Sequence, residues 1–318
     1  MTAIKAPFPW FGGKSRVAHE VWARFGDTPN YVEPFAGSLA VLLGRPHAGK
    51  VETVNDLDGF LANFWRAVSH DASAVARYAD HPVNEVDLHA RHAWLVTRRD
   101  ELVSRLMGDP DYYDVKIAGW WCWGLCCWIG GGWCSGQGPW QSVDGVFQKV
   151  SNAGKGVNRK LPHLGDAGQG CNKSTDLYAW FDALQARLSR VRVCCGDWSR
   201  VVTPSVAERN GMTAVFLDPP YPSHDRAEVY THDTGDVAYD VRDWAIANGD
   251  NPQLRIALCG YSGHWDMPDS WYAHSWKAAG GYGSQGKGTR GAANAHREMI
   301  WFSPHCINSE STLDLLAV

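Results

Sequence analysis

Residues 213–221, Thr-Ala-Val-Phe-Leu-Asp-Pro-Pro-Tyr, constrain the fold of this chain more than any other stretch. The apolar run 215–217 has no polar face, which is typical of a buried strand in a parallel sheet. Neither proline can donate to a strand ladder, so the strand must end before them. Asp218 and Tyr221 are therefore expected just past the carboxyl edge of a sheet, where open α/β folds bind ligands.

The other apolar runs alternate between strand and helix patterns, which predicts an α/β fold. We expect strands at the start of 30–43 and over 51–54, 191–195, 215–217, 254–259 and 298–302, the last of these closing the sheet. We expect helices over 17–25, from about Ser38, over 88–107 and over 174–188, and a helix with Leu57, Phe60, Leu61, Phe64 and Val68 along its buried stripe.

The pattern changes from about residue 69 onward. Residues 69–173 are interpreted as an inserted lobe, with 1–68 and 174–318 forming the main domain. A segment rich in Trp, Cys and Gly, 118–134, lies within this lobe. At least half of its tryptophans are expected in the core.

Basic residues in two Gly-containing loop regions suit contacts to phosphate groups, with solvated loops as the alternative interpretation. The candidates are Lys149, Lys155, Arg159, Lys160, Lys287 and Arg290. Because the net charge of the whole chain is −4, a nucleic-acid interface must be a local patch.

Cysteine content and hydropathy bear on cell compartment and metal binding. The nine cysteines and the absence of a secretory signal indicate a reduced, cytoplasmic protein. The uncharged span 117–143 is long enough for a membrane helix, but its Gly and Trp content argues against one. Zinc binding by Cys122, Cys126, Cys127 and Cys134 is a weaker alternative, because their spacing fits no common zinc ribbon. We therefore expect no metal.

Three further segments carry residues suited to an adenosine-type ligand. Residues 7–16 contain Gly12, Gly13 and Lys14, a flexible turn with a cation. The strand, Gly-bearing turn and helix in 30–43 have the geometry that holds such cofactors, and Asp56 follows at the distance of a ribose-binding acid. Asp58 is expected to cap a helix.

The order of these blocks resembles the DNA adenine methylase family, the D12-class N6-adenine DNA methyltransferases of bacteria and phages. Trp10, Gly12, Gly13 and Lys14 match the family's amino-terminal cofactor motif, and residues 31–37, Tyr-Val-Glu-Pro-Phe-Ala-Gly, match its first methyltransferase motif. Asn55-Asp56 matches the ribose-binding acid, and Asp218-Pro219-Pro220-Tyr221 matches the catalytic motif. Asp197-Trp198 stands where the family usually has Asp-Phe. The match covers 5–68 and 174–303 but not the lobe, which stands where the family keeps its target-recognition domain.

The resemblance implies a Rossmann-like methyltransferase sheet with an inserted target-recognition lobe. The implied reaction is S-adenosyl-L-methionine-dependent methylation of the N6 amine of a flipped-out adenine in DNA. Asp218 and the Pro219 carbonyl would accept hydrogen bonds from that amine, and Tyr221 would stack on the base. Pro220 completes the implied catalytic motif.

The implied cofactor-binding set is Trp10, Gly12, Gly13, Lys14, Glu33, Pro34, Phe35, Ala36, Gly37, Ser38, Asp56, Asp197, Trp198 and Asp218. Within it, the resemblance assigns Lys14 to the methionine carboxylate, Asp56 to the ribose and Asp197 to the adenine amine. Phe35 and Trp198 would pack nearby, with simple core packing as the alternative for Phe35.

The expected partner is double-stranded DNA in a bacterial host cytoplasm, in a phage or restriction-modification setting, with no membrane and no obligate protein partner. Two alternatives stay open. One is methylation of cytosine N4, whose enzymes usually have Ser in place of Asp218, or of RNA. The other is a non-catalytic nucleic-acid-binding homologue, which the intact Lys14, Asp56 and Asp218 disfavour.

Overall fold

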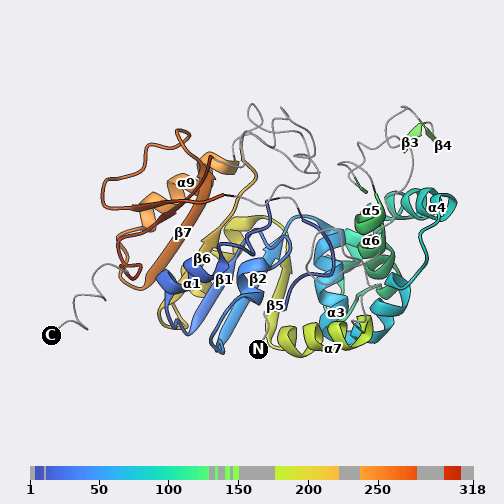
Figure 1. Cartoon of the computed structure of the whole chain (residues 1–318), viewed down its shortest axis with the longest axis horizontal. Coiled ribbons are helices and arrows are strands. Elements are labelled where there is room, and N and C mark those ends of the chain that lie inside the picture. Colours follow the sequence, from blue (N-terminus) through green and yellow to red (C-terminus); the bar gives the residue numbers. More distant parts are fainter. Residues whose placement is uncertain are drawn as a thin grey trace.

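A computed structural model describes residues 4–10, 12–128, 133–134, 140–143, 146–149, 176–221, 237–277 and 297–308. Seven of the described strands form one sheet in the order β5-β2-β1-β6-β7-β9-β8 (Figure 1). Their bounds are β1 Asn30–Glu33, β2 Val51–Asp56, β5 Val191–Cys195, β6 Thr213–Leu217, β7 Leu254–Tyr261, β8 Tyr272–Ser275 and β9 Glu298–Phe302. The first five are parallel, and β9 pairs antiparallel with both β7 and β8. The predicted α/β fold is confirmed.

Helices lie on both sides of this sheet. They are α1 Ala18–Phe25, α2 Ala40–Leu43, α3 Gly59–Ala79, α4 Glu85–Val96, α5 Arg99–Gly108, α6 Val115–Cys127, α7 Leu177–Leu188, α8 Pro204–Ala207 and α9 Val237–Asn248, with a 3₁₀ turn η1 at Trp198–Val201. In Figure 1, α3 to α7 gather beyond the β5 side of the sheet, and α9 lies near β7. A separate antiparallel hairpin consists of β3 Trp140–Val143 and β4 Val146–Lys149.

Alternate residues of the central strands enter two different hydrophobic clusters. On β6, Ala214 and Phe216 join the cluster that includes α1, α3, α6 and α7. Val215 and Leu217 join the cluster that includes α8 and α9. All five residues of β6 are buried, and β6 pairs in parallel with β1 and β7. The predicted buried parallel strand is confirmed.

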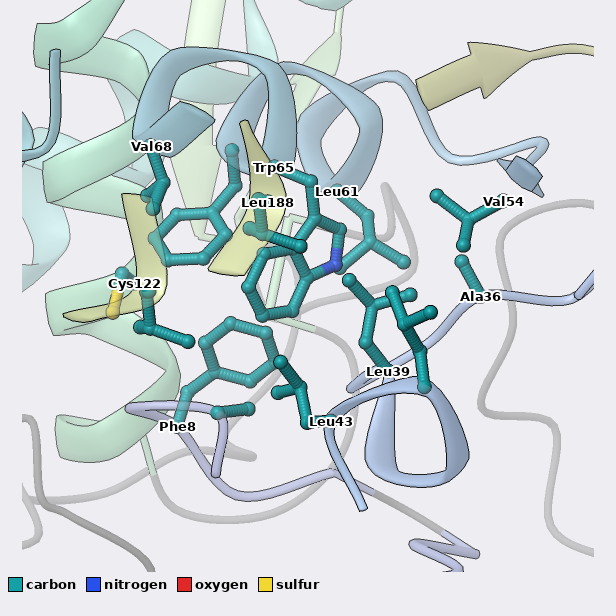
Figure 2. Close-up of a cluster of buried hydrophobic side chains, with 14 of the residues drawn as sticks. Phe8, Ala36, Leu39, Leu43, Val54, Leu61, Trp65, Val68, Cys122 and Leu188 are labelled. Atoms are coloured by element: carbon teal, nitrogen blue, oxygen red, sulfur yellow. The ribbon is translucent and has the colours of Figure 1, made fainter. Parts of the chain in front are cut away.

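The larger cluster joins the sheet to the helices at its β5 side, and Figure 2 shows part of it. Phe8, Trp65 and Cys122 lie together there with Leu188 of α7. Trp121, Trp123, Trp128 and Trp133 are also buried, which confirms that most tryptophans of 118–134 are core. Since the α6 cysteines Cys122, Cys126 and Cys127 are buried among them, they act as small apolar side chains.

Several expectations about local structure were wrong. Residues 88–107 form two helices, α4 and α5, separated at Thr97 and Arg98. The Thr97 hydroxyl donates to the Trp94 carbonyl, a local bond of the kind that competes with helix continuation. Leu57 is 48% exposed because it precedes α3, so it is not part of the buried stripe. The strand 298–302 does not close the sheet, since the unpredicted strand β8 lies outside it.

The helix after β2 begins where its cap was predicted. The Asp58 carboxylate accepts a hydrogen bond from the Phe60 amide, 2.9 Å away. The helix then continues to Ala79 through a non-helical residue at Asp71, whose carboxylate caps the second half at Ala74. Helix α3 therefore extends past residue 68, and the division into a main domain and an inserted lobe at 69–173 stays a prediction.

The helices and the polar side chains of the described residues bear on membrane and metal binding. Within the described part of the chain, no helix combines the length and apolar composition needed to cross a membrane. The same residues contain no cluster of three or more His, Cys, Asp or Glu side chains that could hold a metal ion.

Candidate active site

The sheet has a topological switch point between β1 and β6. From β1 the chain proceeds outward to β2 and β5 in one direction, and from β6 to β7 in the other. Loops that leave the carboxyl ends of such neighbouring strands diverge, which opens a binding site between them. The turn after β1 and the residues from Asp218 to Tyr221 leave the sheet at this place.

The amino-terminal loop delivers Lys14 to the end of β6. Gly12 has φ +68°, a conformation that favours glycine, and its carbonyl accepts a hydrogen bond from Lys14 Nζ at 2.9 Å. The same Nζ lies 2.8 Å from Asp218 Oδ2. Lys14 is 3% exposed, so this cation is buried against the proposed catalytic carboxylate.

A second carboxylate, Glu298, completes this charge cluster. Its Oε2 lies 3.0 Å from the Tyr221 hydroxyl and 4.0 Å from Lys14 Nζ. The Tyr221 hydroxyl also lies 3.2 Å from Asp218 Oδ1. The Tyr221 ring packs edge-on against Tyr261 of β7, with centroids 4.5 Å apart. In this arrangement Tyr221 is 8% exposed.

Burial and the neighbouring charges together shift the pKa values of Lys14, Glu298 and Tyr221. Burial by itself would lower the pKa of Lys14, but the charges of Asp218 and Glu298 outweigh it and raise the pKa well above its usual value. Burial raises the pKa of Glu298, and Lys14 offsets this in part. Burial, followed by the charge of Glu298, raises the pKa of Tyr221. Lys14 therefore stays charged and Tyr221 stays neutral at physiological pH.

The turn after β1 is built around Gly37. Its φ is +47°, and a Cβ at this position would lie 2.5 Å from Trp10 Nε1, so only glycine fits. The buried Trp65 indole donates to the Gly37 carbonyl at 3.0 Å. Leu39, two residues on, also has a positive φ of 53° and is fully buried. Packing therefore holds this turn in a conformation that costs backbone energy.

The end of β2 connects this turn to the end of β5. Asp56 Oδ2 accepts from the Gly37 amide at 3.1 Å, and its Oδ1 accepts from the Asp58 amide. The Asn55 side-chain amide donates to the Pro34 and Gly196 carbonyls at 3.1 and 2.9 Å. Burial raises the pKa of Asp56 to about 6.

Asp197 and Trp198 follow β5 at the same edge of the sheet. Asp197 is exposed, and its carboxylate caps η1 through the Ser199 amide. The rings of Trp198 and Phe35 face each other, with centroids 6.3 Å apart and planes 27° apart. Phe35 is half-buried, so it is not simply part of the core.

The remaining predicted cofactor residues lie in or beside the turn after β1. Ala36 is buried and Ser38 is partly exposed. Glu33 is buried at the end of β1, where it accepts a hydrogen bond from the Tyr31 hydroxyl at 2.9 Å. Burial raises the pKa of Glu33 to about 8, so this carboxyl is a structural partner of Tyr31 in the ligand-free chain.

The structure thus brings together the predicted residues of the amino-terminal loop, the ends of β1, β2 and β5, and the Asp218 motif. It does not test the predicted DNA contacts. Lys149 lies in β4 with its side chain undescribed, and Lys155, Arg159, Lys160, Lys287 and Arg290 lie outside the described residues.

Sequence reasoning missed Glu298 as a site residue. Because β9 is antiparallel, its first residue lies at the edge where the parallel strands end, opposite Tyr261 of β7. An acid at the start of an otherwise apolar strand was the available signal. It could be interpreted only with the direction of β9 known.

The side chains at this edge of the sheet fit S-adenosylmethionine. Asp56 and Asp197 are carboxylate acceptors suited to hydroxyl and amine donors, the facing rings of Phe35 and Trp198 suit a purine, and Gly37 keeps the turn after β1 free of a side chain. Lys14 supplies a cation beside Asp218 at the end of β6.

Comparison with known proteins agrees with this geometry. The family model of the D12 class of N6 adenine-specific DNA methyltransferases matches residues 10–103. That range includes Lys14, Gly37 and Asp56, and Lys14 contacts Asp218 beyond it. No curated protein matches the chain. The matched range is 94 of the chain's 318 residues. Over that range, and with its seven-stranded, mostly parallel sheet, the chain is similar to the D12 class of adenine-specific DNA methyltransferases, which methylate the N6 amine of adenine in DNA with S-adenosyl-L-methionine.

Proposed function

We propose that this chain methylates an adenine that has been flipped out of double-stranded DNA, with the target amine held by Asp218 and the Pro219 carbonyl. The observation that carries the proposal is the buried Lys14–Asp218 contact at the carboxyl end of β6. The Asp218 side chain is 22% exposed, whereas that of Lys14 is 4% exposed. A fixed carboxylate with an accessible side is suited to receive a ligand.

The chemistry of the amine explains why such an acceptor is needed. The lone pair of an exocyclic amine is delocalised into the ring, which makes it a poor nucleophile. Hydrogen bonds from the amine to Asp218 and to the Pro219 carbonyl turn the lone pair out of the ring plane and stabilise charge developing on nitrogen. Pro220 limits the backbone freedom of this motif, so much of the rate gain comes from positioning.

We propose that the cofactor lies along the ends of β1, β2 and β5. When bound, S-adenosylmethionine supplies a methyl group on a sulfonium, an electrophile that needs no metal. Asp56 would hold the ribose, Asp197 the adenine amine, and Phe35 and Trp198 the purine faces. The loop from Trp10 to Gly13, with the turn 33–38, would complete its walls.

Lys14 has two candidate roles in this site. Its contact with Asp218 supports a role in orienting the catalytic carboxylate. The assignment to the methionine carboxylate remains part of the proposal, and it requires Lys14 to share its three hydrogens between two carboxylates.

We propose that Tyr221 stacks on the flipped base. Tyr221 is 8% exposed, so base entry must uncover one face of its ring. Flipping is required because the amine cannot reach Asp218 from inside a duplex, and it costs a few kcal/mol.

A test of the reaction uses labelled S-adenosylmethionine, duplex DNA of mixed sequence and RNA, followed by identification of the labelled nucleoside. We expect N6-methyl-2′-deoxyadenosine from DNA with the wild type and with Asp240→Asn, a control at an exposed aspartate on α9. Asp218→Asn should bind DNA normally and lose transfer. Label found in cytosine or in RNA would show that the substrate is not the adenine of DNA that we propose. No label in any nucleic acid would favour a non-catalytic homologue.

DNA binding by the region 69–173, which we propose as the target-recognition lobe, has its own test. Neutralising Lys155, Arg159 and Lys160 together should weaken DNA binding and reduce its dependence on salt, because fewer counterions are released. The matched control neutralises Lys5, Lys50 and Arg190, three exposed residues outside this region. An unchanged salt slope in the lobe variant would assign the DNA surface elsewhere, with Lys287 and Arg290 as the next candidates.

A further inference from the structure

The Tyr221 hydroxyl has one hydrogen but two carboxylate neighbours. Asp218 Oδ1 lies at 3.2 Å and Glu298 Oε2 at 3.0 Å, both within hydrogen-bond distance. A phenol can donate one hydrogen bond and accept others. Each contact can be a full two-centre hydrogen bond only if one of the two carboxyl groups carries a proton and donates it to the Tyr221 oxygen.

Charge and burial decide which carboxyl carries the proton. Lys14 Nζ lies 2.8 Å from Asp218 but 4.0 Å from Glu298, so the cation stabilises ionised Asp218 more strongly. The Glu298 side chain is 6% exposed against 22% for Asp218, so ionising Glu298 costs more desolvation. With Glu298 neutral, the one cation and the one anion balance.

The other titratable groups around Glu298 do not change this assignment. Among the described residues, these are Cys259 and Tyr261 on β7 and the neighbouring Arg297, in addition to Lys14, Asp218 and Tyr221. Neither Cys259 nor Tyr261 can supply a positive charge. The Arg297 guanidinium lies over the Tyr261 ring, 5.4 Å from its centroid, and donates to the Ser262 carbonyl, whereas Lys14 Nζ lies 4.0 Å from Glu298. Burial is also the leading cause that raises the pKa of Glu298 despite Lys14.

We propose that Glu298 is a positioning residue that is protonated in the resting enzyme and donates to Tyr221, so that the Tyr221 hydroxyl donates to Asp218. This deepens the proposed function and rests on it, because Asp218 is taken as the acceptor of the target amine. Lys14 then fixes one oxygen of Asp218 and Tyr221 the other. The lone pairs left on the carboxylate keep a single orientation toward the amine.

The first test compares Glu298→Gln with Glu298→Met in single-turnover methylation. Glutamine keeps a hydrogen-bond donor of the same shape and should retain the wild-type rate to within about threefold. Methionine has similar length but no donor, so the rate should fall on the order of tenfold with little change in the KM for cofactor. Equal losses in both variants would overturn the proposal, since an ionised Glu298 would then be needed.

The second test is the pH profile of the same rate. Wild-type activity should fall as pH rises through the titration of Glu298, because its proton is lost, and this limb should be missing in Glu298→Gln. The same alkaline limb in both proteins would contradict the proposal.

A third test needs no catalysis. A carboxyl whose pKa is raised by folding stabilises the fold when protonated, and this stabilisation is lost as pH rises from the unfolded value through the folded value. The melting temperature of the wild type should therefore fall relative to that of Glu298→Gln as pH rises above about 4.5. Parallel curves would overturn the protonation assignment. If the curves diverge but the wild type transfers no methyl group, the proposed function fails and the protonated Glu298 stands.

Discussion

Lys14 and Asp218 are 204 residues apart in the sequence, and their side chains meet at 2.8 Å. The pair joins the amino-terminal glycine loop to the end of β6. Asp218 also contacts the hydroxyl of Tyr221, which belongs to the larger hydrophobic cluster. The cation held here compensates the charge of the Asp218 carboxylate. The pair therefore contributes both to the geometry of the site and to its charge balance.

Lys14→Met should reduce kcat/KM for methyl transfer on the order of 100-fold, because Asp218 loses the cation that orients it and compensates its charge. It should also destabilise the fold, by less than the about 3–5 kcal/mol typical of a fully buried pair, since Asp218 is 22% exposed. Steady-state kinetics and urea unfolding measure the two effects. Lys50→Met, at an exposed lysine, is the control. Wild-type kinetics in Lys14→Met would exclude a role for this cation.

Gly37→Ala should weaken cofactor binding and destabilise the chain by about 1–3 kcal/mol, because a Cβ at φ +47° is strained and would lie 2.5 Å from Trp10 Nε1. Gly108→Ala is the control, since a Cβ there meets nothing within 4 Å. Calorimetric titration with S-adenosylmethionine and urea unfolding give both quantities. Equal affinity in the two variants would mean that this turn does not border the cofactor.

The main sheet could be predicted from sequence because most of its strands contain short apolar runs bounded by polar or turn residues. The strands at 191–195 and 298–302 have the predicted bounds, and β6 begins two residues before the predicted run 215–217. Strand β8 was missed because three of its four residues are exposed, so it has no apolar run. The break between α4 and α5 was missed because both helices continue one apolar pattern across Thr97 and Arg98.

The site was predictable where a motif lies at the end of a parallel strand, as with Asp56, Asp197 and Asp218. It was not predictable where tertiary pairing decides the outcome. Resemblance assigns Lys14 to the methionine carboxylate, whereas its partner in the ligand-free chain is Asp218. Glu298 enters the site only because β9 runs antiparallel between β7 and β8, and local sequence does not specify strand direction.

Cofactor affinity should increase as pH rises through about 6, because burial raises the pKa of Asp56 to about 6 and only its ionised form accepts hydrogen bonds from both ribose and backbone. Titration calorimetry between pH 5 and 8 measures this step. Asp56→Asn should bind more weakly at pH 8 and lose the step, and Asp240→Asn should keep it. A step that persists in Asp56→Asn would assign the titration to another group.

Asp56 should also make the stability of the fold depend on pH. Its pKa rises from 3.8 to about 6 on folding, so the folded state favours the protonated form. Its contribution is complete below the unfolded value and is lost as pH rises through about 6. The free energy of unfolding of Asp56→Asn should therefore increase relative to that of the wild type as pH rises from about 4 to 6. Urea titrations at several pH values measure this difference. A constant difference across that range would contradict the raised pKa.

Gly119→Ala tests whether the helices beyond α3 share one cooperative core with the sheet. A Cβ at Gly119 of α6 would lie 2.3 Å from the Tyr78 Cβ and 2.6 Å from the Val75 carbonyl oxygen of α3, so the two helices would have to separate. Because α3 also packs on Leu188 and the sheet in one hydrophobic cluster, we expect a loss of about 2–4 kcal/mol in a single unfolding transition. Gly108→Ala, in α5, should change the stability by less than about 1 kcal/mol. Intrinsic tryptophan fluorescence and far-UV circular dichroism should give coincident urea curves for Gly119→Ala. Two separated transitions, with only the first displaced, would instead mean that the proposed lobe unfolds independently of the methyltransferase sheet.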